Sequence, residues 1–168
     1  MAEASRRAAR AATRGGLPNA LFVVAAAERL PSELRAVADE LTILFPWGSL
    51  LHGALAMHDA AAAGIASLLR PDAFLTAFVS ITARDGLPLA SIDEPGEADA
   101  LAARWACHGL RLESTCQAAA DEIAASGSTW ARRLGAGAPS GRPAWKIRLR
   151  RDGVTTYMPS HDVLRRHG

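Results

Sequence analysis

The chain has 168 residues, enough for one domain with a hydrophobic core. Hydrophobic residues make up 49% of it and charged residues 21%, and its mean hydropathy is +0.06, an ordinary globular composition. No apolar run reaches the length of a transmembrane helix, and no apolar stretch follows the first arginines as it would in a signal peptide. We therefore expect a cytoplasmic protein with no membrane partner.

The net charge is only +2, but the basic residues concentrate at the two ends of the chain. This asymmetry suggests an anionic partner such as nucleic acid. The alternative is an arginine-rich composition in which the charged side chains simply face solvent. The basic residues concerned are Arg6, Arg7, Arg10 and Arg14 at the start, and Arg132, Arg133, Arg142, Lys146, Arg148, Arg150, Arg151, Arg165 and Arg166 at the end.

Cys107 and Cys116 are nine residues apart and fall in different expected elements. This spacing favours neither a disulfide framework nor a metal-binding pair, so we expect both to be small core residues. His52 and His58 are six residues apart, and no carboxylate completes a ligand set with them. We expect no metal.

Short apolar runs alternate with helical patterns along the chain. Strands are expected at residues 20–24, 41–45, 73–81, 110–115 and 144–149. Helices are expected at residues 2–13, 32–39 with Ser32 as N-cap, 49–56, 59–69 capped by Asp59, 97–107, 118–125 and 130–134. A turn is expected at residues 70–72, and loops at 84–96 and 135–143. Alternating strands and helices predict a parallel α/β sheet, and the last two strands are expected to form an antiparallel hairpin.

The stretch from Leu41 to Leu51 organises this pattern. An apolar run without polar alternation predicts a strand buried on both faces, and Pro46, Trp47 and Gly48 follow it directly. Ligands of open α/β sheets bind just beyond the carboxyl ends of such strands, so Trp47 lies where an active site is expected. The alternative for Trp47 is a core aromatic at the sheet edge.

Three other tryptophans bear on that choice. Trp130 follows a Ser-Gly-Ser-Thr break and has the same two interpretations as Trp47, an active-site residue or a core residue. Trp105 and Trp145 lie inside elements with apolar periodicity and are expected in the core.

Three motifs carry a resemblance to a known family: GGLPN and AAAERLP within residues 15–31, LFPWGSLL at 44–51, and STWARRL at 128–134. In this order and spacing the chain resembles the 16S rRNA adenine-N1 methyltransferases of the kanamycin–apramycin resistance type, over roughly residues 1–149. The resemblance implies a class I S-adenosylmethionine-dependent methyltransferase sheet, which is Rossmann-like. It also implies methyl transfer from S-adenosyl-L-methionine to N1 of decoding-site adenosine 1408, which gives aminoglycoside resistance.

The resemblance assigns roles to individual residues. Trp47 and Trp130 match the two tryptophans that sandwich the extruded adenine, and aromatic stacking is worth ~1–3 kcal/mol per base. The residues expected to line the cofactor pocket are Ala27, Glu28, Leu44, Ser49, Ser128 and Thr129. Those expected to contact rRNA phosphates are Arg132 and Arg133, with Arg142, Arg6, Arg7 and Arg10 as weaker candidates. For Glu28 the alternative is a solvent-facing turn residue, and for each arginine a solvated one.

The chain also departs from the family. The family's first two strands, its glycine-rich loop and the acidic residue ending its second strand have no counterpart here. We therefore expect a partial domain at residues 1–150, with unpaired strand edges and weak or absent cofactor binding, followed by a tail at 151–168. A start codon placed too far downstream, or a fragmentary gene, would explain this.

The expected partner is 16S rRNA in the small ribosomal subunit, bound by a monomer. The alternatives are a class I methyltransferase acting on another RNA such as tRNA, and a non-catalytic RNA-binding remnant.

Overall fold

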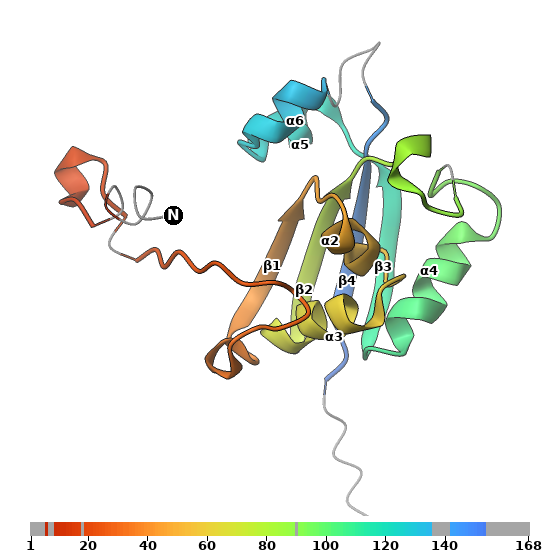
Figure 1. Cartoon of the computed structure of the whole chain (residues 1–168), viewed down its shortest axis with the longest axis horizontal. Coiled ribbons are helices and arrows are strands. Elements are labelled where there is room, and N and C mark those ends of the chain that lie inside the picture. The colour runs from red at the N-terminus through yellow and green to blue at the C-terminus, as the bar shows by residue number, and fades with distance from the viewer. Residues whose placement is uncertain (1–5, 7–8, 18, 90, 136–141, 154–168) are drawn as a thin grey trace, which may run out of the picture.

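The structure is a computed structural model that describes residues 6, 9–17, 19–89, 91–135 and 142–153. Four strands form one sheet in the order β1-β2-β4-β3 (Figure 1). β1 (Ala38–Leu44) is parallel to β2 (Leu69–Val79), and β4 (Trp145–Arg151) is antiparallel to both β2 and β3 (Leu110–Gln117). The predicted α/β sheet with an antiparallel hairpin at its end is confirmed.

Three helices pack on one face of this sheet (Figure 1): α2 (Ser49–Ala54), α3 (Asp59–Leu68) and α4 (Glu97–Ala106). The main core lies between them and the strands, where Leu75, Ile147 and Leu149 are fully buried against helix residues that include Trp105. Burial of each such aliphatic side chain stabilises the fold by ~1.5–3 kcal/mol.

Within the described residues, helix residues cover the second face of the sheet only near its end, where Phe78 clusters with Ile123 and Ala131. Thr42 and Leu44 are exposed on this face, so the prediction that their strand is buried on both faces is wrong. Farther along the same face, Phe74 lies beneath the guanidinium groups of Arg148 and Arg150, at 4.3 and 5.7 Å from the ring centroid. Long basic side chains thus cover much of the apolar surface that this face carries.

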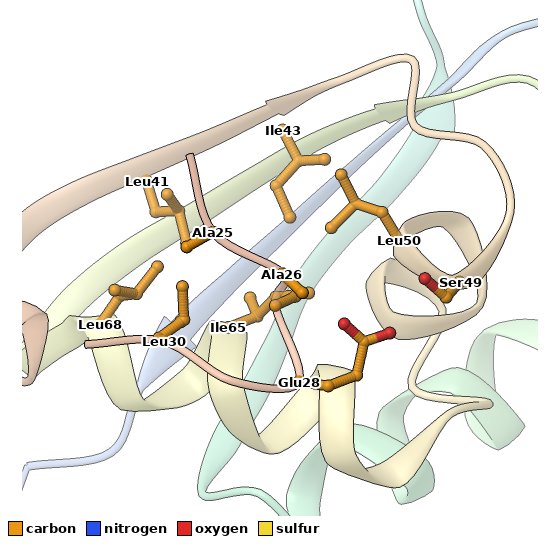
Figure 2. A pocket seen from close by; sticks show the side chains of 11 residues that line it. Ala25, Ala26, Glu28, Leu30, Leu41, Ile43, Ser49, Leu50, Ile65 and Leu68 are labelled. Atoms are coloured by element: carbon orange, nitrogen blue, oxygen red, sulfur yellow. The ribbon is translucent and has the colours of Figure 1, made fainter. Parts of the chain in front are cut away.

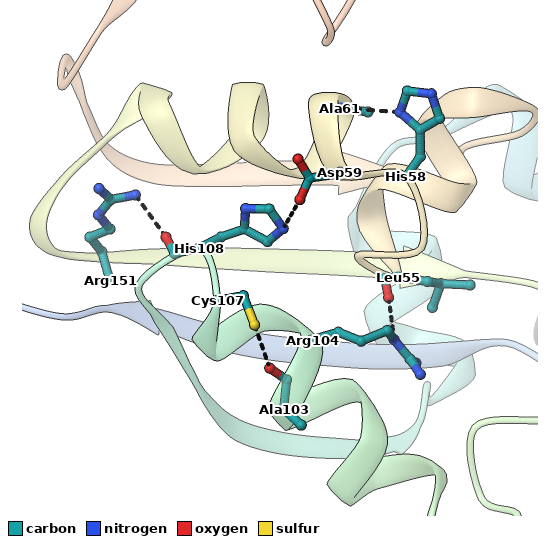
Figure 3. Close-up of polar contacts among 9 residues, drawn as sticks. All are labelled: Leu55, His58, Asp59, Ala61, Ala103, Arg104, Cys107, His108 and Arg151. Atoms are coloured by element: carbon teal, nitrogen blue, oxygen red, sulfur yellow. Dashed lines mark hydrogen bonds and ion pairs between the residues drawn. The ribbon is translucent and has the colours of Figure 1, made fainter.

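Polar contacts fix the helices to one another and to the sheet (Figure 3). Arg104 Nε donates to the carbonyl of Leu55 at 3.0 Å, and His108 Nε2 lies 3.5 Å from Asp59 Oδ1. Arg151 on β4 donates to the carbonyl of His108 at 3.3 Å. These contacts hold α4 against the α2–α3 pair.

Two short helices, α5 (Ala120–Ala125) and α6 (Thr129–Leu134), connect β3 to β4. They stand beyond the end of the sheet at which β1 and β2 terminate (Figure 1). Single turns of 3-10 helix occur at η1 (Ala12–Arg14), η2 (Ser32–Leu34) and η3 (Ala83–Asp85).

The predicted strand at residues 20–24 is absent from the structure. The segment is extended but has no strand beside it, and Leu21 and Val24 are 81% and 76% exposed. Figure 1 shows it running away from the sheet. An apolar run becomes a strand only where a neighbour accepts its hydrogen bonds, and within the described residues β2 is the one neighbour of β1.

Several local predictions are also wrong. The helix at 32–39 is only the η2 turn, because the chain enters β1 at Ala38. Pro31 rather than Ser32 precedes that turn, and His58 rather than Asp59 caps α3 through its ring nitrogen. The turn at 70–72 lies within β2, with a left-handed φ of 67° at Asp72.

Two further outcomes concern the termini and the cysteines. Of the helix predicted at 2–13, residues 1–5 and 7–8 lie outside the described part, and the η1 turn occupies its end. Cys107 and Cys116 are exposed, so they are not core residues. The described residues contain no helix long and apolar enough to cross a membrane.

Candidate functional site

The loop after β1 turns sharply at the carboxyl edge of the sheet. Phe45 adopts a left-handed φ of 48°, which is an outlier for a bulky residue, while its N–H donates to the carbonyl of Phe78 at 2.7 Å. Gly48 follows with φ 58° and ψ −139°, a conformation open to glycine. Between them Pro46 is buried and Trp47 is 75% exposed. The backbone thus presents the indole to solvent.

Trp130 is presented in a similar way by α6. Ser128 caps this helix, because its Oγ accepts a hydrogen bond from Ala131 N at 3.1 Å. Trp130, in the first turn, is 43% exposed. The core interpretation is therefore wrong for Trp47 and Trp130. It is confirmed for Trp105 and Trp145, which are 0% and 6% exposed.

A pocket of about 310 Å³ lies beside β1 (Figure 2). Ala27, Glu28 and Ser49 line it, together with apolar side chains that include Leu41 and Ile65. Figure 2 shows the Glu28 carboxylate on the side of the pocket that holds Ser49. Hydrogen bonds from its own backbone N–H and from the Ser49 hydroxyl lower the pKa of Glu28, which keeps this carboxylate charged.

Gly64 of α3 leaves room for the segment that carries Glu28 to pack directly on the helix. A Cβ at position 64 would collide with the carbonyl oxygen of Ala27, so the chain crosses the helix directly over this glycine. The Ala26–Arg29 bridge closes the tight turn around Glu28. The sequence interpretation overlooked Gly64, whose only signal is a glycine inside an alanine-rich helix.

The chemistry of this pocket fits the adenine end of S-adenosylmethionine. The Glu28 carboxylate can accept a hydrogen bond from an exocyclic amine, and the apolar wall can contact a ring. Within the described residues, no second carboxylate and no glycine-rich turn lines the same pocket to hold a ribose or a methionine group.

The six predicted cofactor residues fall into separate places. Ala27, Glu28 and Ser49 share the pocket beside β1. Ser128 lines another hollow of about 340 Å³ between α5 and α6. Thr129 is exposed in the first turn of α6, and Leu44 is 36% exposed at the end of β1, outside both hollows.

The predicted RNA-contacting arginines also differ in environment. Arg132 and Arg133 are exposed on α6, beside Trp130. Arg142 is half-buried and donates to Thr82 Oγ1 at 3.2 Å, a contact that holds the end of β2 to the start of β4. Arg6 and Arg10 are exposed, and Arg7 lies outside the described residues. No group of three or more potential metal ligands occurs in the part of the chain that the structure describes.

Comparisons with known proteins agree with one another. A family model described as "NpmA: 16S rRNA (adenine(1408)-N(1))-methyltransferase" matches residues 1–146. A 16S rRNA (adenine(1408)-N(1))-methyltransferase from Streptoalloteichus hindustanus is 41% identical over 139 residues, covering 80% of this chain and 64% of the relative. One from Escherichia coli is 32% identical over 146 residues, covering 79% and 64%. The chain therefore spans about 64% of the length of these curated relatives.

Solved structures give the same result. The 16S rRNA methyltransferase KamB superposes with a TM-score of 0.76 at 31% identity, over 90% of this chain and 72% of that one. A mutant 16S rRNA (adenine(1408)-N(1))-methyltransferase from Catenulisporales acidiphilia, crystallised with its cosubstrate SAM, superposes with a TM-score of 0.75 at 28% identity, over 92% and 71%. With its sheet, its motifs and these matches in agreement, the chain belongs to the 16S rRNA (adenine(1408)-N(1))-methyltransferase family.

Proposed function

We propose that this protein transfers a methyl group from S-adenosyl-L-methionine to N1 of adenosine 1408 of 16S rRNA in the small ribosomal subunit. The observation that carries the proposal is the pair Trp47 and Trp130, two exposed indoles at the carboxyl edge of one sheet. Relatives that carry this activity in their names support it. Methylation at this position would protect the ribosome against aminoglycosides.

The two indoles act on the target base. An adenine must leave its helical stack before its N1 edge can react, and stacking between two aromatic faces compensates for part of that cost, at ~1–3 kcal/mol per base. The N1 lone pair would form the new N–C bond as the bond from the methyl carbon to sulfur in S-adenosylmethionine breaks, with S-adenosylhomocysteine as the leaving group. No proton would have to be removed from N1 first. The protein's contribution is then the orientation of the base, and the proposed reaction requires no general base.

S-adenosyl-L-methionine supplies the electrophilic methyl group when bound. Ala27, Glu28 and Ser49 would hold its adenine end, with Glu28 accepting from the amine, while Leu44, Ser128 and Thr129 would lie nearer the reacting end. Because the described residues offer contacts mainly to the adenine, we expect weak cofactor binding by this chain. A titration that reaches saturation at low micromolar cofactor would contradict that expectation.

Arg132 and Arg133 are proposed to bind rRNA phosphates beside the target base, because they are exposed next to Trp130. Arg6, Arg7 and Arg10 are proposed as peripheral contacts. Arg142 is proposed to act mainly by holding Thr82. We further propose a monomer in the cytoplasm, without metal, with a partial class I methyltransferase domain at residues 1–150 and a tail at 151–168.

The proposal is tested by incubating the purified chain with bacterial 30S subunits and radiolabelled S-adenosylmethionine at high concentration. Primer extension then locates the methyl group. We expect label in 16S rRNA and a stop at adenosine 1408, because N1 methylation blocks base pairing. Label in bulk tRNA, with none in 16S rRNA, would favour another RNA substrate. RNA binding without label on either RNA would favour a non-catalytic binding protein.

A further inference from the structure

A small hydrophobic cluster at the carboxyl edge stands apart from the main core. Two of its members are neighbours of the stacking tryptophans in sequence. Phe45 lies two residues before Trp47, and Ala131 directly follows Trp130. The cluster therefore connects the loop after β1 with α6, more than eighty residues farther along the chain. Its buried side chains are Phe45, Phe78, Ala118, Ile123, Ala131 and Ala144.

On the side of the loop after β1, contacts with Phe78 fix the position of this cluster. Phe45 stacks on Phe78 with ring centroids 6.3 Å apart and 28° between the planes, and its backbone N–H is bonded to the same residue. Only Pro46, which is buried and has a restricted φ, separates Phe45 from Trp47. Any displacement of Phe45 would thus pass directly to the Trp47 indole.

On the side of α6, the cluster contains the small side chain of Ala131. Ala131 is 1% exposed, and its N–H is fixed by the Ser128 cap. α6 has six residues, and a hollow of about 340 Å³ separates it from α5. Ala131 is the α6 residue in this cluster, so the size of its side chain bears on how far α6 stands from the loop after β1.

We propose that Ala131 is a positioning residue that sets the distance between Trp47 and Trp130, and so determines whether a flat base is held on both faces. The inference rests on the proposed function of the two tryptophans. Extra methylenes in a well-packed cluster force side chains off their rotamers and shift the backbone. A larger side chain at position 131 therefore moves α6 outward, and a base between the indoles then stacks on one face only.

The experiment compares Ala131→Leu with Ala125→Leu, the same substitution at an exposed position at the end of α5. Both variants are labelled with 5-fluorotryptophan, and the four tryptophan signals are assigned by replacing each tryptophan with phenylalanine in turn. We expect A131L to shift the signals of Trp47 and Trp130 but not those of Trp105 and Trp145. A125L should shift none of them.

Methylation kinetics give the functional half of the test. For A131L, we expect the rate at saturating 30S subunits to fall by about tenfold or more, because small misplacements are costly to catalysis. The half-saturating concentration of 30S should change by less than about threefold, since phosphate contacts are untouched. Ile123→Ala, which frees volume on the α5 side of the same cluster and leaves the Phe45–Phe78 stack intact, should restore much of the rate when combined with A131L.

Three results would overturn the proposal: fluorine signals of A131L that match those of A125L, a loss carried entirely by weaker 30S binding, or no recovery with Ile123→Ala. If A131L does not fold, Ala131→Val is judged by the same criteria. If the unsubstituted chain transfers no methyl group, the proposed function fails, while the fluorine spectra still decide whether Ala131 controls the two indoles.

Discussion

The four tryptophans of this chain divide into two pairs that occupy different regions. Trp105 and Trp145 lie in the helix-covered core, and Trp47 and Trp130 lie at the carboxyl edge of the sheet with large parts of their rings in solvent. The core pair lies within regular elements, whereas the edge pair lies in a loop and in the first turn of a short helix. An indole that does not pack in the core and that the backbone presents to solvent is available to bind a ligand.

The largest expected effect comes from the core. Trp105→Ala removes a fully buried indole, together with its Nε1–H hydrogen bond to the carbonyl of Ala54 at 3.3 Å. Large-to-small changes of this kind destabilise by ~3–5 kcal/mol, which we expect in urea unfolding followed by circular dichroism. Trp105→Phe is the milder control. A loss below about 1 kcal/mol would mean that the core is not packed around this residue.

Substitution of Trp47 or Trp130 should instead lower activity and leave stability nearly unchanged. We expect Trp47→Ala and Trp130→Ala each to lower methylation of 30S subunits by about ten- to a hundredfold, the equivalent of ~1–3 kcal/mol of lost stacking. The free energy of unfolding should change by less than about 0.5 kcal/mol. Phenylalanine at either position should retain part of the activity. Equal losses of stability in the two pairs would remove the distinction between them.

The contrast between the pairs also shows what sequence reasoning could reach. Trp105 and Trp145 follow apolar periodicity, so their burial was predictable, as were α2, α3, α4 and the strand that becomes β2. Trp47 and Trp130 were identified by their motifs and their place at element ends. Periodicity shows which side chains an element buries on its apolar face, and it does so without showing which distant segment covers that face.

The remaining features depend on contacts between distant segments. Residues 20–24 have strand-like side chains, but strand formation requires a neighbouring chain that the sequence pattern cannot supply. The left-handed Phe45 is bonded to Phe78, and the importance of Gly64 arises from the Ala27 carbonyl above it. His58 caps α3 through a ring nitrogen, although Asp59 is the better cap by residue type.

A smaller effect is expected for Gly64, which lies beneath the segment that carries Glu28. By helix propensity alone, Gly64→Ala should stabilise α3 by about 1 kcal/mol. The collision with the Ala27 carbonyl should outweigh this gain, giving a net loss of about 1–2 kcal/mol and weaker binding of S-adenosylhomocysteine in an NMR titration. Ala63→Gly, at the exposed neighbour, is the control, because it should lower stability without altering ligand binding. A stabilised Gly64→Ala variant would show that the segment is free to move off the helix.

The smallest effect concerns pH. The pKa of Glu28 is lowered, so its carboxylate stays charged below the pH at which an ordinary glutamate takes up a proton. Binding of S-adenosylhomocysteine should therefore persist as pH falls past that ordinary pKa and fade only as pH falls through the lowered one. Glu28→Gln should bind more weakly at neutral pH and lose this dependence. An affinity that declines already between about pH 6 and 5 would contradict the assignment.

The position of β1 at the side of the sheet has a consequence for amide exchange. In the described residues β1 is paired through β2 alone, so alternate N–H groups along Ala38–Leu44 point toward β2 and away from it. Hydrogen–deuterium exchange should then alternate between slow and fast amides along this strand, whereas β4 and the Phe74–Val79 part of β2, each flanked on both sides, should be protected at nearly every residue. The same experiment should show rapid exchange throughout residues 20–24.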